Sequence, residues 1–199
     1  MNFFEELGKY QIILGSQSPR RQYLLKELGI KFDVKLKQMV DEVYPEDLTK
    51  EEIPLYLARI KAEAFDDELN ENIIVITADT IVWKEGQVLQ KPKDEKEAFD
   101  ILKSLSGSVH QVYTGVCIRS VNQKSTFSSR TNVYFKDLTD KEIWYYIDKY
   151  EPFDKAGSYG IQEWLGYIGV EKIEGSFFNV MGLPVQKLYV ELKKFLNIQ

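Results

Sequence analysis

The chain has 199 residues, of which 31 are acidic and 26 basic, and its formal net charge is −5. Hydrophobic residues make up 44% of it and aromatic residues 13%, which is enough for a core and argues against disorder. The acidic balance argues against a general binder of nucleic acids or anionic membranes, because such proteins usually carry a surplus of basic residues.

Rare residue types exclude several kinds of site. Cys117 is the one cysteine and His110 the one histidine, which excludes an internal disulfide, a thiolate metal cluster and a multi-histidine zinc site. We interpret Cys117 as inert core, and a structural role is favoured for His110. The start of the chain does not resemble a signal peptide, and no apolar run is long enough for a membrane helix, so we expect a cytoplasmic protein without membrane contact.

Strand-like and helix-like segments alternate along the chain without a repeat or a long linker. The predicted strands are 11–14, 73–83, 109–119, 126–136 and 166–173, with a hairpin turn at 84–87 and a loop at 151–163. The predicted helices start at Ser18-Pro19 and end at Gly29, cover about 52–68, run from Asp94 to Gly107, start at Thr139, and cover about 184–197. Because hairpins and crossovers both occur, we predict an α/β fold with a mixed sheet in a single domain, 1–199.

The first unusual segment is the start of the helix that follows the first strand. Arg20 and Arg21 lie in its first turn, where the partial positive charge of a helix N-terminus disfavours them. A bound polyanion would remove this conflict, since backbone N–H groups, guanidinium groups and the hydroxyls of Ser16 and Ser18 suit phosphate oxygens. The alternative is a serine cap with two solvated arginines paired with nearby acids, and the residue types leave both interpretations open.

Asp79 interrupts the otherwise apolar strand 73–83. An unpaired buried carboxylate is costly, so such a group is usually hydrogen-bonded, paired with a cation, bound to a metal or kept as a general base. The alternative is an aspartate at the strand end that caps the following segment.

Weaker signals come from single polar residues. Lys61 lies on the apolar stripe of its predicted helix, and by itself this indicates only a snorkelling side chain. Lys91 precedes a proline, which predicts extended backbone and no function. Asp41-Glu42 is a metal-ligand candidate, although acid pairs in loops are usually solvated. Gln162 closes a loop rich in small residues and can read a base edge, unless the loop is an ordinary tight connection.

No P-loop and no G-x-G-x-x-G dinucleotide motif is present. Instead, ordered segments from residue 11 to about 192 resemble the Maf family of nucleoside triphosphate pyrophosphatases. The matching segments are Ser16-x-Ser18-Pro19-Arg20-Arg21-x-x-Leu24-Leu25, Asp41-Glu42, Ala58-x-x-Lys61-Ala62, Ala78-Asp79-Thr80-x-Val82, Lys91-Pro92, Leu105-Ser106-Gly107-x-x-His110-x-Val112-x-Thr114-Gly115, Asp154-Lys155-Ala156-Gly157-x-Tyr159-Gly160-Ile161-Gln162 and Gly182-Leu183-Pro184.

The resemblance implies helices around the sheet, a cleft between two lobes, and cleavage of a nucleoside triphosphate between its α and β phosphates. Asp79 would accept a proton from water, and it would share a Mg²⁺ or Mn²⁺ ion with Glu42. Arg20, Thr80 and Gln162 stand where the family sets base preference, and they resemble the subgroup acting on dTTP and UTP. Substrate phosphates would be bound by Ser16, Ser18, Arg20, Arg21, Lys61 and Lys91.

The expected partner is thus a nucleoside triphosphate, including modified pyrimidine nucleotides that are kept out of nucleic acid. The resemblance also implies a homodimer, and the charge balance implies no stable complex with nucleic acid. Two alternatives remain: a nucleotide- or nucleic-acid-binding regulator of cell division without turnover, and a phosphatase that releases orthophosphate.

Overall fold

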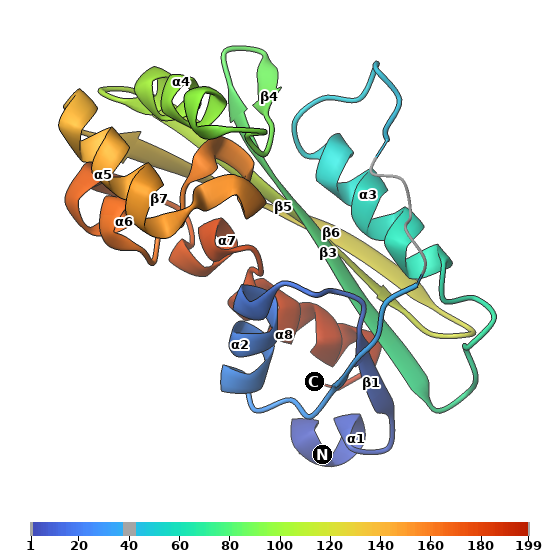
Figure 1. Cartoon of the computed structure of the whole chain (residues 1–199). Helices are drawn as coiled ribbons and strands as arrows, with labels where there is room; N and C mark the ends of the chain where they lie inside the picture. Colours follow the sequence, from blue (N-terminus) through green and yellow to red (C-terminus); the bar gives the residue numbers. More distant parts are fainter. Residues whose placement is uncertain (1, 38–42, 199) are drawn as a thin grey trace. The chain divides into compact units, whose positions relative to one another are not determined.

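The computed structural model describes residues 2–37 and 43–198 (Figure 1). Its helices are α1 (Phe3–Leu7), α2 (Pro19–Glu27), α3 (Glu52–Glu63), α4 (Glu95–Leu105), α5 (Asp140–Tyr150), α6 (Trp164–Gly169), α7 (Phe177–Met181) and α8 (Val185–Phe195), with short 3₁₀ helices η1 (Pro152–Asp154) and η2 (Ala156–Ser158). Its strands are β1 (Gln11–Leu14), β2 (Asp33–Val34), β3 (Ile73–Lys84), β4 (Gln87–Leu89), β5 (Val109–Arg119), β6 (Lys124–Phe135) and β7 (Val170–Glu174).

The strands form one seven-stranded sheet in the order β2-β1-β3-β5-β6-β7, with β4 paired to β3. Strand β1 runs parallel to both β2 and β3, whereas the β3–β4 and β6–β7 pairs are antiparallel. The predicted α/β fold with a mixed sheet is therefore confirmed. Within residues 2–37 and 43–198, no helix has both the length and the apolar character needed to cross a membrane.

The chain divides into two compact units. The first comprises the residues up to Asp79 together with 114–129 and 182–199, and the second comprises 80–113 and 130–181. Strands β3, β5 and β6 each contribute residues to both units, because the division falls within these strands. The predicted single domain with a cleft stays a prediction.

In the first unit, the buried half of β3 is the centre of the core. Residues 73–79 are all buried, as predicted for an apolar strand covered on both faces. Helix α3 packs on this core through Ala58 and Ala62, which form a fully buried cluster with Cys117. Burial raises the pKa of Cys117 to about 11, so the thiol stays protonated and the prediction of an inert core cysteine is confirmed.

Helix α3 approaches strand β5 very closely at one glycine. A Cβ atom on Gly115 would lie 2.3 Å from the carbonyl carbon of Pro54 and 2.5 Å from the backbone nitrogen of Leu55. Both of these atoms belong to the backbone, so a rotamer change cannot relieve the contact. The absent side chain at Gly115 therefore sets how near α3 lies to the sheet.

In the second unit, local sequence signals determine most element ends. The predicted hairpin joins β3 to β4 with positive φ at both Glu85 (49°) and Gly86 (87°), as a type I′ turn requires. Asp94 caps α4 by accepting from the Glu97 backbone N–H at 2.8 Å. Thr139 begins α5 with the predicted capping box.

Two predicted elements need correction. The helix predicted over 52–68 ends at Glu63, after which bonds such as Phe65 N–H to Ala62 C=O tighten the chain into turns. The strand predicted near 166–173 is wrong in its first half, where α6 precedes β7. A Cβ atom on Gly166 would lie 1.9 Å from the Ile161 carbonyl oxygen, so a close backbone contact that no periodicity reveals shapes this turn. The short helices α1 and α7 were not predicted.

We predict that Gly115→Ala destabilises the protein by about 1–3 kcal/mol, because the new methyl group forces α3 and β5 apart. Urea unfolding at pH 7 measures this change. Gly169→Ala is the matched control, since its Cβ would meet only the Leu138 side chain at 3.4 Å. Equal stability losses in the two variants would contradict the importance of the close contact.

Candidate active site

The loop between β1 and α2 holds the first group of predicted site residues. Ser16 is buried, with an exposed fraction of 7%. Its Oγ accepts hydrogen bonds from the Ser18 backbone N–H and from Arg21 Nη1, both at 3.3 Å. Arg21 Nε also donates to the carbonyl oxygen of Gly182 at 2.9 Å. The structure thus brings Ser16, Ser18 and Arg21 together as predicted.

These bonds define what the loop can bind. Because the Ser16 hydroxyl oxygen accepts two hydrogen bonds, the hydroxyl hydrogen is the group with which it can donate to a ligand. Ser18 stands at the N-cap position of α2, as predicted. Its side chain, however, makes no capping hydrogen bond with any described residue. Hydrogen bonds from Arg21 to the oxygens of Gly182 and Ser16 orient its guanidinium group. The first turn of α2 carries no acid. This arrangement favours an anion at the start of α2.

Two residues outside the predicted set shape this loop. The Gln22 side-chain amide donates to the carbonyl oxygens of Ser16 at 3.4 Å and Gln17 at 3.3 Å. Gly182 supplies the carbonyl that orients Arg21. A polar side chain one turn into α2 was the available signal for Gln22. The family-like segment Gly182-Leu183-Pro184 marked Gly182, but not its contact with Arg21, which lies 161 positions away.

The second group is an ion pair between α3 and β3. Lys61 Nζ lies 2.6 Å from Asp79 Oδ1, and the two side chains are only 18% and 11% exposed. The prediction that a buried Asp79 has a partner is therefore confirmed. The interpretation of Lys61 as a merely snorkelling side chain is wrong, because its ammonium is directed at this carboxylate.

Residues of the second unit hold the remaining predictions. Thr80 is half-buried on β3, and Lys91 is exposed between β4 and α4. Gln162 is half-buried after η2, and its buried Oε1 has no hydrogen-bond partner among the described residues. A buried amide oxygen without a partner is uncommon and fits an acceptor for a ligand.

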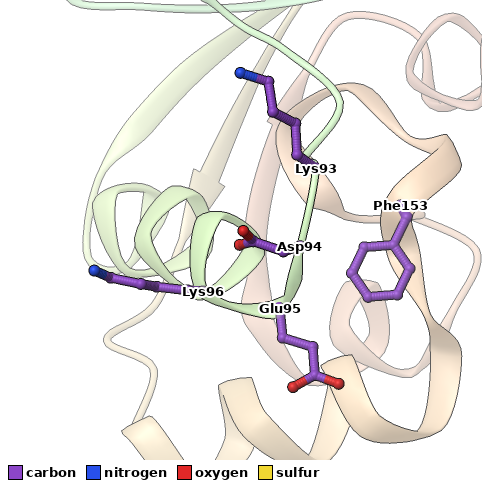
Figure 2. Close-up of a pocket in the computed structure, with 5 residues that line it drawn as sticks. All are labelled: Lys93, Asp94, Glu95, Lys96 and Phe153. Atoms are coloured by element: carbon purple, nitrogen blue, oxygen red, sulfur yellow. The ribbon is translucent and has the colours of Figure 1, made fainter.

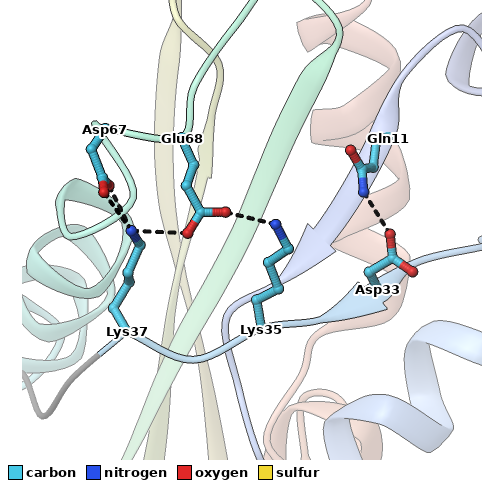
Figure 3. A network of polar contacts seen from close by, with 6 residues as sticks. All are labelled: Gln11, Asp33, Lys35, Lys37, Asp67 and Glu68. Atoms are coloured by element: carbon cyan, nitrogen blue, oxygen red, sulfur yellow. Dashed lines mark hydrogen bonds and ion pairs between the residues drawn. The ribbon is translucent and has the colours of Figure 1, made fainter.

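The predicted metal ligand Glu42 and its neighbour Asp41 lie outside the described residues. A network of ion pairs holds the chain up to Lys37 (Figure 3). Lys37 Nζ lies 2.6 Å from Asp67 Oδ1 and 2.8 Å from Glu68 Oε1, and Lys35 Nζ lies 2.7 Å from Glu68 Oε2. The hydrogen bonds from Lys35 and Lys37 lower the pKa of Glu68. The start of the segment that leads to Glu42 is therefore tied to the turn after α3.

Asp79 fits a hard divalent cation, because its nearly buried carboxylate supplies an oxygen ligand. In the part of the chain that the structure describes, no three histidine, cysteine, aspartate or glutamate side chains gather into a metal cluster. Mg²⁺ typically needs only one or two protein carboxylates together with substrate phosphates and waters. The donor set therefore matches an ion that arrives with a phosphorylated substrate.

A hollow of about 460 Å³ lies at the start of α4 (Figure 2). It is lined by Lys93, Asp94, Glu95, Lys96 and Phe153, and none of the predicted site residues is among them. Because its charges are mixed and two acids, Asp94 and Glu95, stand at the start of the helix, this hollow does not resemble a phosphate site.

His110 has the structural role that was favoured for it. It is 1% exposed, its Nε2 lies 2.7 Å from the Tyr159 hydroxyl oxygen, and its ring contacts Phe135 edge to face. Burial, aided by the charge of Lys84, lowers the pKa of His110 from 6.5 to about 3. The imidazole is therefore neutral at pH 7 and forms part of an aromatic cluster.

Comparison with known proteins identifies the family of this chain. Residues 11–195 match the family model described as Maf-like protein, and the chain belongs to this family. It is 56% identical over 190 residues to a protein of Phocaeicola vulgatus, covering 96% of this chain and 98% of the relative. It is 56% identical over 191 residues to one of Parabacteroides distasonis, covering 96% and 99%, and 50% identical over 185 residues to one of Flavobacterium johnsoniae, covering 93% and 95%. All three relatives are named dTTP/UTP pyrophosphatase.

We predict that His110 makes the fold sensitive to acid. Below pH 6.5 the His110 side chain of the unfolded chain becomes protonated, whereas in the folded protein it stays neutral down to its lower pKa of about 3. The free energy of unfolding therefore falls as the pH drops from 6.5 towards 3. The expected loss is at most about 1.4 kcal/mol per pH unit. Urea unfolding at pH 7 and pH 5 should show a steeper loss in the wild type than in His110→Gln, and equal losses would contradict the prediction.

Proposed function

We propose that this protein is a dTTP/UTP pyrophosphatase that hydrolyses the bond between the α and β phosphates. The products are the nucleoside monophosphate and pyrophosphate. The observation that carries the proposal is Asp79, a nearly buried carboxylate paired with Lys61, in a chain whose relatives of 50–56% identity bear this name. Modified pyrimidine triphosphates belong to the same proposed substrate class.

Asp79 is proposed as the general base. The attacking water must lose a proton as it bonds to the α phosphorus, and a positioned carboxylate that accepts this proton typically contributes about 10²–10⁴-fold to the rate. Lys61 pairs with the ionised carboxylate, which is the form that can accept a proton. The pair also fixes the direction of Asp79, since Oδ1 is held at 2.6 Å.

The loop before α2 is proposed to hold the triphosphate. Ser16 and Ser18 supply hydroxyl donors, and Arg20 and Arg21 supply charge at a helix start that already favours anions. Lys61 and Lys91 add further positive charge, as the family resemblance implies. Positioning and electrostatic stabilisation of the leaving pyrophosphate then provide most of the catalysis.

A divalent ion, Mg²⁺ or Mn²⁺, is proposed as the cofactor. Asp79 and Glu42 are the residues proposed to hold it, and phosphate oxygens complete its coordination. When bound, the ion supplies charge neutralisation and Lewis-acid polarisation at the phosphate.

Base preference is proposed to depend on Arg20, Thr80 and Gln162. Thymine and uracil both present an N3–H donor next to carbonyl acceptors. An amide can complement both, because its oxygen accepts and its nitrogen donates. The buried, unpartnered Oε1 of Gln162 supports this role.

We also propose a cytoplasmic location, a homodimer, and no stable complex with nucleic acid. The net charge of −5 supports the last point, since binding along a phosphate backbone needs a basic surface. A regulator of cell division without turnover is the second candidate function. The name of the relatives disfavours it, because a pyrophosphatase turns its ligand over.

Asp79→Asn is expected to lower kcat for dTTP by at least about 10²-fold, because the amide cannot accept the proton of water. The assay measures pyrophosphate and orthophosphate separately, with dTTP or UTP and with or without Mg²⁺ or Mn²⁺. The wild type should release pyrophosphate, and the control Asp148→Asn, on an exposed position of α5, should match it. Orthophosphate as the product would indicate a phosphatase, and undiminished turnover by Asp79→Asn would remove its proposed role.

Gln162→Glu is expected to weaken the preference for dTTP and UTP over purine triphosphates by about tenfold, since a carboxylate repels the base carbonyls that the amide nitrogen would bind. The measurement is kcat/KM across a panel of nucleoside triphosphates. Gln186→Glu on the exposed side of α8 makes the same charge change as a control. An unchanged substrate profile in Gln162→Glu would exclude this residue from base reading.

A further inference from the structure

Thr77 is a polar residue in the most deeply buried part of β3. Its exposed fraction is 0%, and it stands between apolar neighbours on the strand. Its Oγ1 donates to the carbonyl oxygen of Ala58, in the middle of α3, at 2.6 Å. A mid-helix carbonyl already accepts the N–H four residues on, so this hydroxyl bonds to its second lone pair. Helix α3 does not need this bond for its own formation.

The position of this bond relates it to the proposed general base. Thr77 precedes Asp79 by two residues, so the two side chains project from the same face of β3. Ala58 precedes Lys61 by three residues, so the two lie on the same side of α3. The Thr77–Ala58 hydrogen bond and the Asp79–Lys61 ion pair are therefore two successive links between one strand and one helix, and both are 2.6 Å long.

The methyl group of Thr77 faces the phosphate loop. A Cβ atom on Gly15 would lie 2.8 Å from Thr77 Cγ2, so the threonine packs directly against the residue that precedes Ser16. The Gly15 backbone N–H also donates to the carbonyl oxygen of Ile76 at 2.9 Å. One side chain thus contacts both α3, which carries Lys61, and the loop proposed to hold the triphosphate.

We propose that Thr77 is a positioning residue: its hydroxyl fixes where α3 lies along β3, so that Lys61 orients Asp79 to accept the proton of the water that attacks the α phosphorus. This inference rests on the proposed pyrophosphatase activity. Loss of the hydrogen bond lets α3 shift along the strand, and Asp79 then loses its fixed direction while the phosphate loop remains. Small misplacements of catalytic groups are costly, with a shift of about 1 Å able to reduce the rate by about 10²-fold.

The test compares Thr77→Val with Thr77→Ser in steady-state hydrolysis of dTTP with Mg²⁺, well below the melting temperature. Valine keeps the shape and removes the donor, so kcat is expected to fall by about tenfold or more, with KM changed by less than about threefold. Serine keeps the hydroxyl, so Thr77→Ser should retain most of the wild-type kcat. This split between kcat and KM, and the rescue by serine, would not follow from a general loss of stability.

Thr131→Val is the matched control. Thr131 is also fully buried, and its Oγ1 donates to a backbone carbonyl, that of Ser176, at 3.1 Å within the second unit. This variant should lose stability and keep the wild-type kcat. A similar loss of kcat in Thr131→Val and Thr77→Val would overturn a specific role for Thr77.

The remaining outcomes separate this inference from the proposed function. No pyrophosphate release by the wild type would overturn both. If Thr77→Val has the same kcat as the wild type, the positioning role alone is overturned. The same holds if Thr77→Ser loses as much kcat as Thr77→Val. Should Thr77→Val not fold, Thr77→Cys places a weaker donor at the same position, where a lowered kcat at similar KM supports the proposal and a wild-type kcat overturns it.

Discussion

The ion pair between Lys61 and Asp79 is the constraint on which the first unit depends. Both side chains are largely buried. An ionised group that is removed from water is stable only when an opposite charge compensates it. Helix α3 must therefore lie close enough to β3 for a lysine to reach the carboxylate. Small residues make this approach possible: Ala58 and Ala62 face the sheet, and Gly115 leaves room for the helix backbone. Packing and charge thus require the same position of α3.

The loop before α2 solves a different electrostatic problem. A helix N-terminus that carries arginines and no acid in its first turn concentrates positive charge. Hydrogen bonds from Arg21 to Ser16 and to the Gly182 carbonyl help to hold this charge in place. Such an arrangement is prepared for an anion before the anion binds, so little reorganisation accompanies binding. The proposed general base and the loop proposed to hold the triphosphate both belong to the first unit.

Sequence patterns predicted the elements whose signals are local. The start of α2 at Pro19, the β3–β4 hairpin and the capping box at Thr139 each depend on residues a few positions apart, and all three are present. The strand predicted near 166–173 failed because a backbone contact between Gly166 and Ile161 shapes a short helix there. Asp79 was recognisable as an acid in an apolar strand. The pairing of Lys61 with it was not, because helical spacing shows on which face of a helix a residue lies but not which element that face contacts.

The sequence by itself determined the mixed α/β class, the family, the unusual arginines at a helix start and the need of Asp79 for a partner. These conclusions follow from composition, from periodicity and from ordered motifs, which are properties of neighbouring residues. Only the tertiary structure decided that this partner is Lys61, that Ser16 acts as the acceptor for Arg21, and that Thr77 links β3 to α3. Lys61 and Asp79 are 18 positions apart, and Thr77 and Ala58 are 19 apart. Contacts at such separations depend on how the helix packs against the sheet, and local sequence carries no record of that packing.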